Sequence, residues 1–247
     1  MTKYELSREL STLYFETGQD LMALEIFQNS YQLLATIAPE NSVLITKMFD
    51  SWGFARSGEY QGGEALLKEA KDALERFDND IYRANLLIAE SMFEVFKDGS
   101  NDSLPMINEA QEKVRKFIGS GNDHTIQMMR GIAYHLSGRH EQAIPLLREY
   151  TASFPYENLT LWTTLADSLL ATKQTTDARD IYEQVLKEYP MYPDAQLGLA
   201  KVYYATGNYE LAKSALEKAL IAWNKAYERH PNKTEALALS EQISAQL

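Results

Sequence analysis

The chain has 247 residues, of which 45% are hydrophobic and 24% charged, and it contains 12 glycines, 7 prolines and no cysteine. This composition is ordinary for a folded chain, and the lack of cysteine excludes disulfides and thiolate chemistry. The net charge is −11. Nucleic acids and anionic membrane surfaces bind clustered cations, so we expect neither as a partner.

The negative charge is concentrated in the first half of the chain. Residues 1–123 carry 12 Lys/Arg and 21 Asp/Glu, a net −9, whereas residues 124–247 carry 12 and 14, a net −2. No stretch of about 18 apolar residues is present, which predicts that no segment inserts into a membrane. The N-terminus has no basic start followed by an apolar run, so we expect no targeting peptide and a cytoplasmic location.

Amphipathic helical patterns fill the chain, with apolar residues recurring three and four positions apart. They predict six helix pairs, at about 4–37, 44–77, 80–118, 124–157, 159–192 and 193–229. Glycines at 18, 58, 138 and 207 follow the first helix of four pairs, where a left-handed residue ends a helix at little cost. Lys173 stands at the same place in the pair at 159–192. After Pro231, a last helix at 234–247 is expected to cap the array through Leu239, Ile243 and Leu247.

The C-terminal half repeats with a period of 34 or 35 residues. Ala166 recurs as Ala200 and Ala178 as Ala212, and small residues let two helices cross closely. The turns of the N-terminal half are spaced by about 40 residues instead. We therefore expect a single array over residues 1–247, with divergent pairs at 1–123, near-regular repeats at 124–229 and the capping helix at 234–247.

The pattern in residues 124–226 resembles three consecutive tetratricopeptide repeats. The middle copy carries the family pattern most completely, with Trp162, Leu165, Ala166, Leu169, Ala178, Tyr182, Val185 and Pro190. The pair at 80–118 departs most, since Met92 takes a small-residue position and the loop Asp98–Pro105 is lengthened. The resemblance implies an all-α fold: a right-handed solenoid of about six antiparallel pairs whose first helices line a concave groove.

In this family the groove receives an extended peptide or a partner helix. The family register places these residues in the groove: Arg8, Phe15, Met48, Trp52, Arg56, Met128, Ile132, His135, Asp167, Leu170, Leu197, Lys201 and Tyr204. Trp52 and Tyr204 stand out, because exposed aromatic side chains are common in binding hot spots. The register does not assemble the Lys, Asn, Asn, Lys, Arg clamp with which some relatives grip a chaperone's C-terminal carboxylate.

The sequence contains no motif for catalysis or for a metal. His135 and His140 are five residues apart on different helices, whereas two ligands on one helix face are three or four apart. The loop at 98–105 lacks the glycine of a calcium loop and contains Pro105. We therefore expect no metal, no cofactor and no enzymatic activity.

Three functions of different kinds fit these patterns. The first is a non-catalytic interaction module, a scaffold, adaptor or assembly chaperone, that binds a protein or peptide as a monomer or small homo-oligomer. The second is a regulatory sensor that binds a signalling peptide or small molecule. The third is an enzyme on a helical scaffold, for which the sequence offers no catalytic group.

Overall fold

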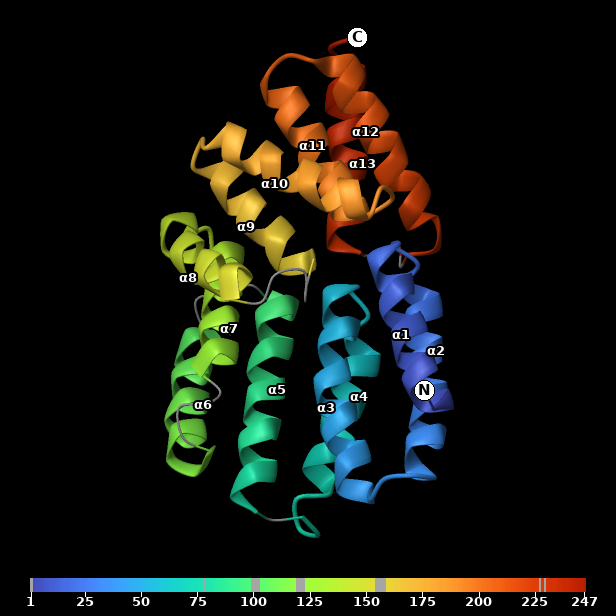
Figure 1. Ribbon diagram of the computed structural model, residues 1–247, viewed down its shortest axis with the longest axis vertical. Coiled ribbons are helices and arrows are strands. Elements are labelled where there is room, and N and C mark those ends of the chain that lie inside the picture. Colours follow the sequence, from blue (N-terminus) through green and yellow to red (C-terminus); the bar gives the residue numbers. More distant parts are fainter. Residues whose placement is uncertain are drawn as a thin grey trace.

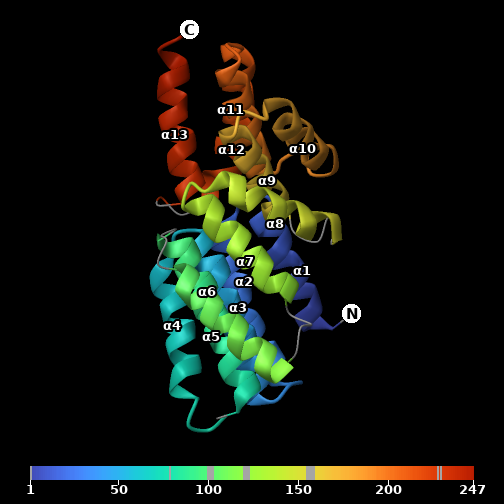
Figure 2. The same ribbon diagram turned by 90° about the vertical axis from the view of Figure 1, so that its left-hand side faces the viewer.

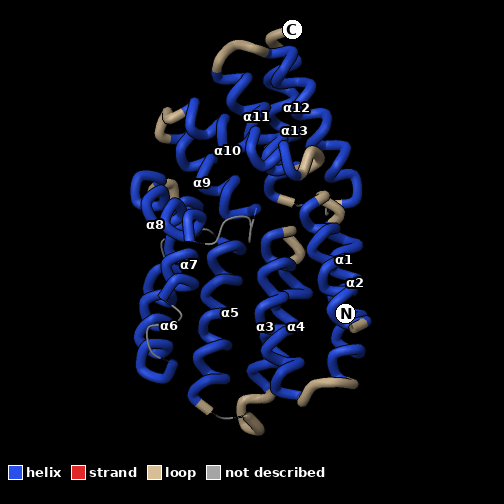
Figure 3. The backbone as a smooth tube through the Cα atoms, viewed as in Figure 1, coloured by secondary structure: helices blue, strands red, loops and turns tan. Residues whose placement is uncertain are grey.

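The computed structural model consists of antiparallel helix pairs that follow one another along the chain. It describes residues 2–77, 79–98, 103–118, 123–153, 159–226, 228 and 230–247. Within these residues every regular element is a helix, as Figure 3 shows. The pairs are α1 (Lys3–Glu16) with α2 (Asp20–Ala35), α3 (Glu40–Arg56) with α4 (Tyr60–Asp72), α5 (Asp80–Asp98) with α6 (Ser103–Ile118), α7 (Asp123–Leu136) with α8 (His140–Ser153), α9 (Leu159–Ala171) with α10 (Thr175–Glu188), and α11 (Pro193–Ala205) with α12 (Tyr209–Ala222). The all-α solenoid of six pairs is therefore confirmed.

The turn inside five of the six pairs has the predicted backbone conformation. Gly18, Gly58, Gly138 and Gly207 have φ angles between 72° and 82°, in the left-handed region. Lys173 occupies the same place with φ of 65°, and it is the one non-glycine residue of the described chain with positive φ. The five turns thus share one geometry, which glycine adopts without strain and lysine does not.

Small residues bring the two helices of each pair together. Ala23, Ala143, Ala178 and Ala212, on the second helices of four pairs, are completely buried. Elsewhere an unusually large neighbour requires glycine: a Cβ at Gly63 would lie 2.4 Å from the Phe93 ring. This contact explains why the pair at 44–77 has glycine where the repeat pattern places alanine.

The end of the array differs in detail from the prediction. The capping helix, α13 (Pro231–Ser244), begins three residues earlier than expected and packs against α11 and α12. Leu239 and Ile243 are buried against these helices, as predicted, but Leu247 is 57% exposed and does not contribute to the cap. Pro155 and residues 99–102 of the predicted lengthened loop lie outside the described residues.

The two halves of the chain form two differently oriented stacks. In Figure 1, α1–α6 stand side by side in the lower part of the molecule, and α9–α13 lie above them. Figure 2, turned by 90°, shows α11, α12 and α13 again above the N-terminal pairs. The last elements return to the first pair: a Cβ at Gly18 would lie 2.8 Å from Trp223, and Lys225 Nζ is 3.6 Å from Met22 Sδ. The superhelix therefore closes on itself.

Replacing Lys173 by glycine should stabilise the protein. The substitution removes a left-handed backbone strain of about 1 kcal/mol, part of which the flexibility of glycine in the unfolded chain offsets. We expect the unfolding midpoint to rise by up to about 2 °C in a thermal melt. The matched control is Gly207→Ala, where a Cβ meets no atom within 4 Å, so that backbone strain alone should lower the midpoint. An equal or lower midpoint for Lys173→Gly would contradict the assignment of strain to this turn.

Enlarging the side chain at a helix crossing should destabilise the protein. Ala212 has no exposed surface, so Ala212→Leu must push α12 away from α11, at a cost of about 1–3 kcal/mol. Urea unfolding would measure this loss. The control is Lys213→Leu, an exposed position on the same helix, which should change stability by about 0.5 kcal/mol or less. Equal effects of the two substitutions would mean that the crossing is not tightly packed.

Candidate partner-binding face

Exposure increases along the first helices of the C-terminal repeats, from their starts toward their turns. The register predicted from the sequence aligns three rows of residues across α7, α9 and α11. The row nearest the helix starts, Met128, Thr163 and Leu197, is buried. In the middle row Ile132 is buried, whereas Asp167 and Lys201 are half-buried.

The third row lies nearest the turns and is the most accessible of the three. It consists of His135, Leu170 and Tyr204, each half-buried, and we call it the turn-side row. A surface cavity of 410 Å³ lies at the neighbouring turns, lined by Gly138, Arg139, His140, Glu141, Gln142 and Thr172. A partner that approaches this face therefore meets an imidazole, an aliphatic side chain and a phenol in sequence.

A ladder of charges runs beside the turn-side row. Lys201 Nζ lies 2.8 Å from Glu235 Oε2 and 3.5 Å from Asp167 Oδ1. The three residues are 34 positions apart in sequence, so each repeat contributes one charge. Burial opposes the charge on Lys201, but the Asp167 and Glu235 carboxylates outweigh it and raise the lysine pKa. Lys201 therefore keeps its positive charge at neutral pH and is held between the two acidic residues.

Tyr182 anchors the acidic end of this ladder. Its hydroxyl donates a hydrogen bond of 2.7 Å to Asp167 Oδ1, and its ring fills the space beside Gly198, where a Cβ would lie 2.2 Å from it. Burial, followed by the nearby Asp167 carboxylate, raises the Tyr182 pKa well above its usual value. The phenol thus stays protonated and holds Asp167 in position.

His135 is held as a neutral imidazole. Burial lowers its pKa, although the Asp167 carboxylate acts in the opposite direction. Its Nδ1 lies 2.9 Å from Ser168 Oγ, and that hydroxyl donates its proton to the Thr164 carbonyl at 3.0 Å. Nδ1 must then carry the ring proton, which leaves Nε2 as a hydrogen-bond acceptor.

The residues predicted for the groove of the N-terminal half make contacts within the chain. Arg8 forms a two-pronged ion pair with Asp50 at 2.5 Å, and its guanidinium lies 4.1 Å from the centre of the Phe27 ring. Phe15 packs against the same Phe27 ring, with 5.3 Å between the ring centres. Met48 is buried in the core. These side chains hold α1, α2 and α3 together.

Trp52 and Arg56 on α3 are likewise engaged inside the molecule. Trp52 is half-buried, and its indole N–H donates a 3.1 Å hydrogen bond to the Ala89 carbonyl on α5. Arg56 reaches across the molecule and pairs with Asp194 on α11 at 3.0 Å. The sequence singles out Trp52 as an aromatic residue of the predicted groove. In the structure its side chain forms a half-buried contact between α3 and α5.

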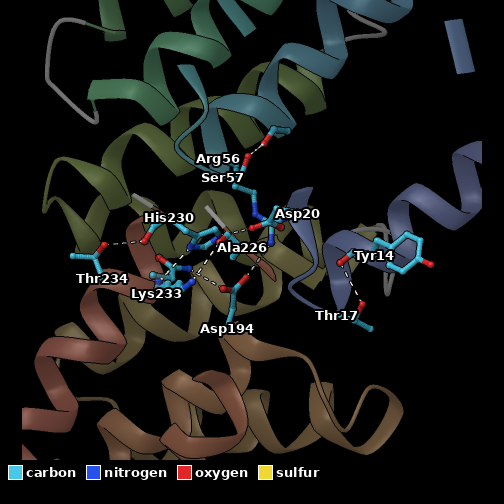
Figure 4. A network of polar contacts seen from close by, with 12 residues as sticks. Tyr14, Thr17, Asp20, Arg56, Ser57, Asp194, Ala226, His230, Lys233 and Thr234 are labelled. Atoms are coloured by element: carbon cyan, nitrogen blue, oxygen red, sulfur yellow. Dashed lines mark hydrogen bonds and ion pairs between the residues drawn. The ribbon is translucent and has the colours of Figure 1, made fainter. Parts of the chain in front are cut away.

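Arg56 belongs to a buried polar junction with Asp20, Asp194 and His230 that connects both ends of the chain (Figure 4). Asp194 also accepts a 2.8 Å hydrogen bond from Asn232, and the Tyr192 hydroxyl lies 3.4 Å from the Arg56 guanidinium. Burial disfavours the Asp194 carboxylate, but Arg56 and its other neighbours outweigh this effect and lower its pKa. Asp20 and His230 complete the junction, with Oδ2 and Nε2 3.3 Å apart. We refer to Asp20, Arg56, Tyr192, Asp194, His230 and Asn232 as the junction cluster.

Of the junction cluster the sequence analysis named only Arg56, as a groove residue, and it did not name Glu235. The signal for Glu235 was present, because acid and base alternate at Asp167, Lys201 and Glu235 with the period of the repeat. No comparable signal exists for Asp20 and His230, which lie 210 positions apart and in different repeats.

In the described parts of the chain, no three His, Asp or Glu side chains are grouped so that they could hold a metal ion. No helix in those parts is both long and apolar enough to span a bilayer.

Comparison with known proteins agrees with this architecture. The tetratricopeptide repeat family model matches two overlapping segments, residues 134–191 and 169–226. The matched residues lie in the C-terminal half of the chain, which is similar to this family. No curated protein matches the sequence significantly.

Three solved structures resemble the chain at low identity. The apo form of RapI is 11% identical with a TM-score of 0.51, and the alignment covers 99% of this chain and 72% of RapI; this likeness shows the fold alone. A signal transduction ATPase with a tetratricopeptide repeat sensor from Pyrococcus horikoshii is 15% identical, with a TM-score of 0.48 and coverage of 97% of this chain. This chain spans 38% of that protein's length. The TPR2AB domain of yeast Sti1, in a pHSP90 complex, is 14% identical, with a TM-score of 0.43 and 98% coverage of both chains.

Removing the Tyr182 hydroxyl should cost about 1 kcal/mol of unfolding free energy, because Asp167 loses a buried hydrogen-bond donor. A double-mutant cycle with Tyr182→Phe and Asp167→Ala, measured by urea unfolding, would isolate the interaction. We expect a coupling energy of at least about 0.5 kcal/mol. A coupling energy near zero would show that the phenol does not hold the carboxylate.

Proposed function

We propose that this chain is a non-catalytic protein-interaction module that binds a peptide or partner segment on the inner face of its C-terminal repeats. The observation that carries the proposal is the turn-side row, which consists of His135, Leu170 and Tyr204. These residues lie on helices that resemble tetratricopeptide repeats, a type of repeat that commonly binds other proteins. The row combines partly exposed apolar surface with fixed polar groups, the combination that gives peptide sites both affinity and orientation.

The chemistry of this face favours an extended peptide with polar or basic character beside an apolar side chain. His135 Nε2 accepts hydrogen bonds, so a peptide N–H is a suitable donor to it. Asp167 and Glu235 flank a single Lys201, which leaves the ladder with a net negative charge. Leu170 and Tyr204 supply the apolar contact between these polar groups.

This placement refines the groove predicted from the sequence. Met128, Ile132 and Leu197 are buried, and the N-terminal positions make contacts within the chain, so the proposed contact surface is limited to the turn-side row and the charge ladder. A role as scaffold, adaptor or assembly chaperone follows from such binding. The lack of cysteine suits a reducing compartment, and we propose the cytoplasm as its location.

Substitution of the turn-side row should weaken peptide binding without unfolding the protein. Random peptides displayed on phage would be selected against the full chain, and the enriched peptides would be titrated against Tyr204→Ala and Leu170→Ala. We expect dissociation constants to rise by about tenfold or more, as is typical for central contacts. Thermal melts would verify that both variants remain folded.

Leu211→Ala is the matched control, since Leu211 is 53% exposed on α12, away from the inner face. Its affinity for the selected peptides should equal that of the wild type. If no peptide is enriched, the proposal of peptide binding is wrong. If peptides are enriched but bind the Tyr204 and Leu170 variants as well as the wild type, the assigned face is wrong.

A further inference from the structure

We propose that the junction cluster is a reversible latch that closes the superhelix, and that Asp20 is the group within it that favours opening. This inference goes beyond the proposed function, because it concerns the contact between the two ends of the chain and not the turn-side row. It rests on the geometry of the junction cluster, in which one ion pair is well satisfied and one carboxylate is not.

The closing side of the latch is the Arg56–Asp194 pair. These residues lie 138 positions apart, on α3 and α11, and their contact joins the two stacks. Asn232 at the start of α13 donates to the second oxygen of Asp194, and Tyr192 lies beside Arg56 and 3.3 Å from Thr160 on α9. Asp194 thus connects α3, α11 and α13, and Tyr192 links this group to α9.

Asp20 is placed differently. It is only 3% exposed, as is His230, yet its Oδ2 has no hydrogen-bond partner. His230 Nε2 approaches Oδ2 to 3.3 Å, but not with the directionality of a hydrogen bond. A buried carboxylate oxygen without a partner carries its full desolvation cost, which is recovered when the contact opens and water reaches the oxygen.

The helix cap fixes the tautomer and the orientation of His230. Its Nδ1 accepts a hydrogen bond from the Lys233 backbone N–H and so caps α13. In the neutral ring the proton must therefore be on Nε2, facing Asp20. The side chain cannot turn to pair better with Asp20 without giving up the cap.

The charged groups that act on Asp20 come from three elements. They are Arg56 on α3, Asp194 on α11 and Lys233 on α13, and His230 lies 3.3 Å away just before α13. The position of Asp20 at the first residue of α2 also favours a negative charge.

Burial outweighs these favourable neighbours at Asp20. It raises the pKa of Asp20 from 3.8 to about 7, an effect that Arg56 reduces and Asp194 increases. Burial lowers the pKa of His230 from 6.5 to about 4, although Asp194 acts in the opposite direction. Asp20 binds a proton more tightly when it is buried, so acidification favours the closed form through Asp20. His230 binds a proton more tightly when it is exposed, so acidification favours the open form through His230.

The two titrations oppose each other in the wild type. Between pH 8.5 and 5.5 the Asp20 carboxyl shifts the equilibrium toward the closed form by about 30-fold, and His230 shifts it back by about tenfold. The net response of the wild type to pH is therefore smaller than that of Asp20 alone, and each half becomes visible only when the other is removed.

Hydrogen exchange of the full chain, followed by mass spectrometry, tests this latch. Amides at the junction, in segments 20–24 and 231–236, should exchange through a local opening and be less protected than core amides in α9 and α10. Asp20→Asn keeps the size of the side chain and removes the buried charge. This variant should protect the junction amides more strongly than the wild type does. The ratio of its protection factors to those of the wild type should fall about 30-fold between pH 8.5 and 5.5.

Two further variants complete the experiment. His230→Asn preserves a capping side chain and removes the titrating imidazole. The ratio of its junction protection factors to those of the wild type should rise about tenfold when the pH falls from 8.5 to 5.5. Arg56→Met leaves Asp194 buried without its cation and should lower junction protection by at least tenfold, with α10 unaffected. Asp177→Asn, an exposed acid in the first turn of α10, is the control and should change nothing.

A pair of glycines separates latch contact from backbone strain. Gly18→Ala and Gly207→Ala place a Cβ on the same left-handed backbone, but only the first meets Trp223, at 2.8 Å. Gly18→Ala should lower junction protection and Gly207→Ala should not. The proposal is overturned if junction amides are as protected as the core, which would mean that no separate opening exists, or if Asp20→Asn leaves their protection unchanged at pH 8.5.

Discussion

The close crossing of the two helices in each pair is the constraint on which the structure depends. Fully buried alanines at 23, 143, 178 and 212 let the backbones approach, and a large side chain such as Leu147 or Tyr182 then fills the space beside them. Stacked pairs built in this way bring α11 and α13 above the N-terminal pairs (Figure 1), and the contacts of the junction cluster form there.

The repeating part of this architecture could be predicted from sequence because its causes are local. Helix periodicity, small residues at the crossings and glycines at the turns lie within one repeat of each other, and all six pairs are found where they were expected. Even Lys173 adopts the backbone angle that its place in the pattern requires. The start of the capping helix and the role of Leu247 were less predictable, since a single terminal helix has no repeat to compare with.

The site could be predicted only in part, because exposure depends on contacts between repeats far apart in sequence. The register placed His135, Leu170 and Tyr204 on one row, and the structure shows that these half-buried residues form the most accessible of the three rows. It gave the same weight to Met128 and Leu197, which are buried in the hydrophobic core. No property of Asp20 or His230 alone indicates a neighbour 210 residues away, so the junction cluster became visible only in three dimensions.

Closure of the array also has a consequence for folding. In an open solenoid each repeat contacts only its neighbours, so stability is a sum of local terms and the terminal repeats fray independently. Here the Arg56–Asp194 contact joins the second pair to the sixth across 138 residues. Opening of α13 or α2 removes partners from the opposite end of the chain, so the two ends are thermodynamically coupled. The molecule thereby gains a cooperativity that a linear array of the same repeats lacks, together with the slower folding that distant contacts impose.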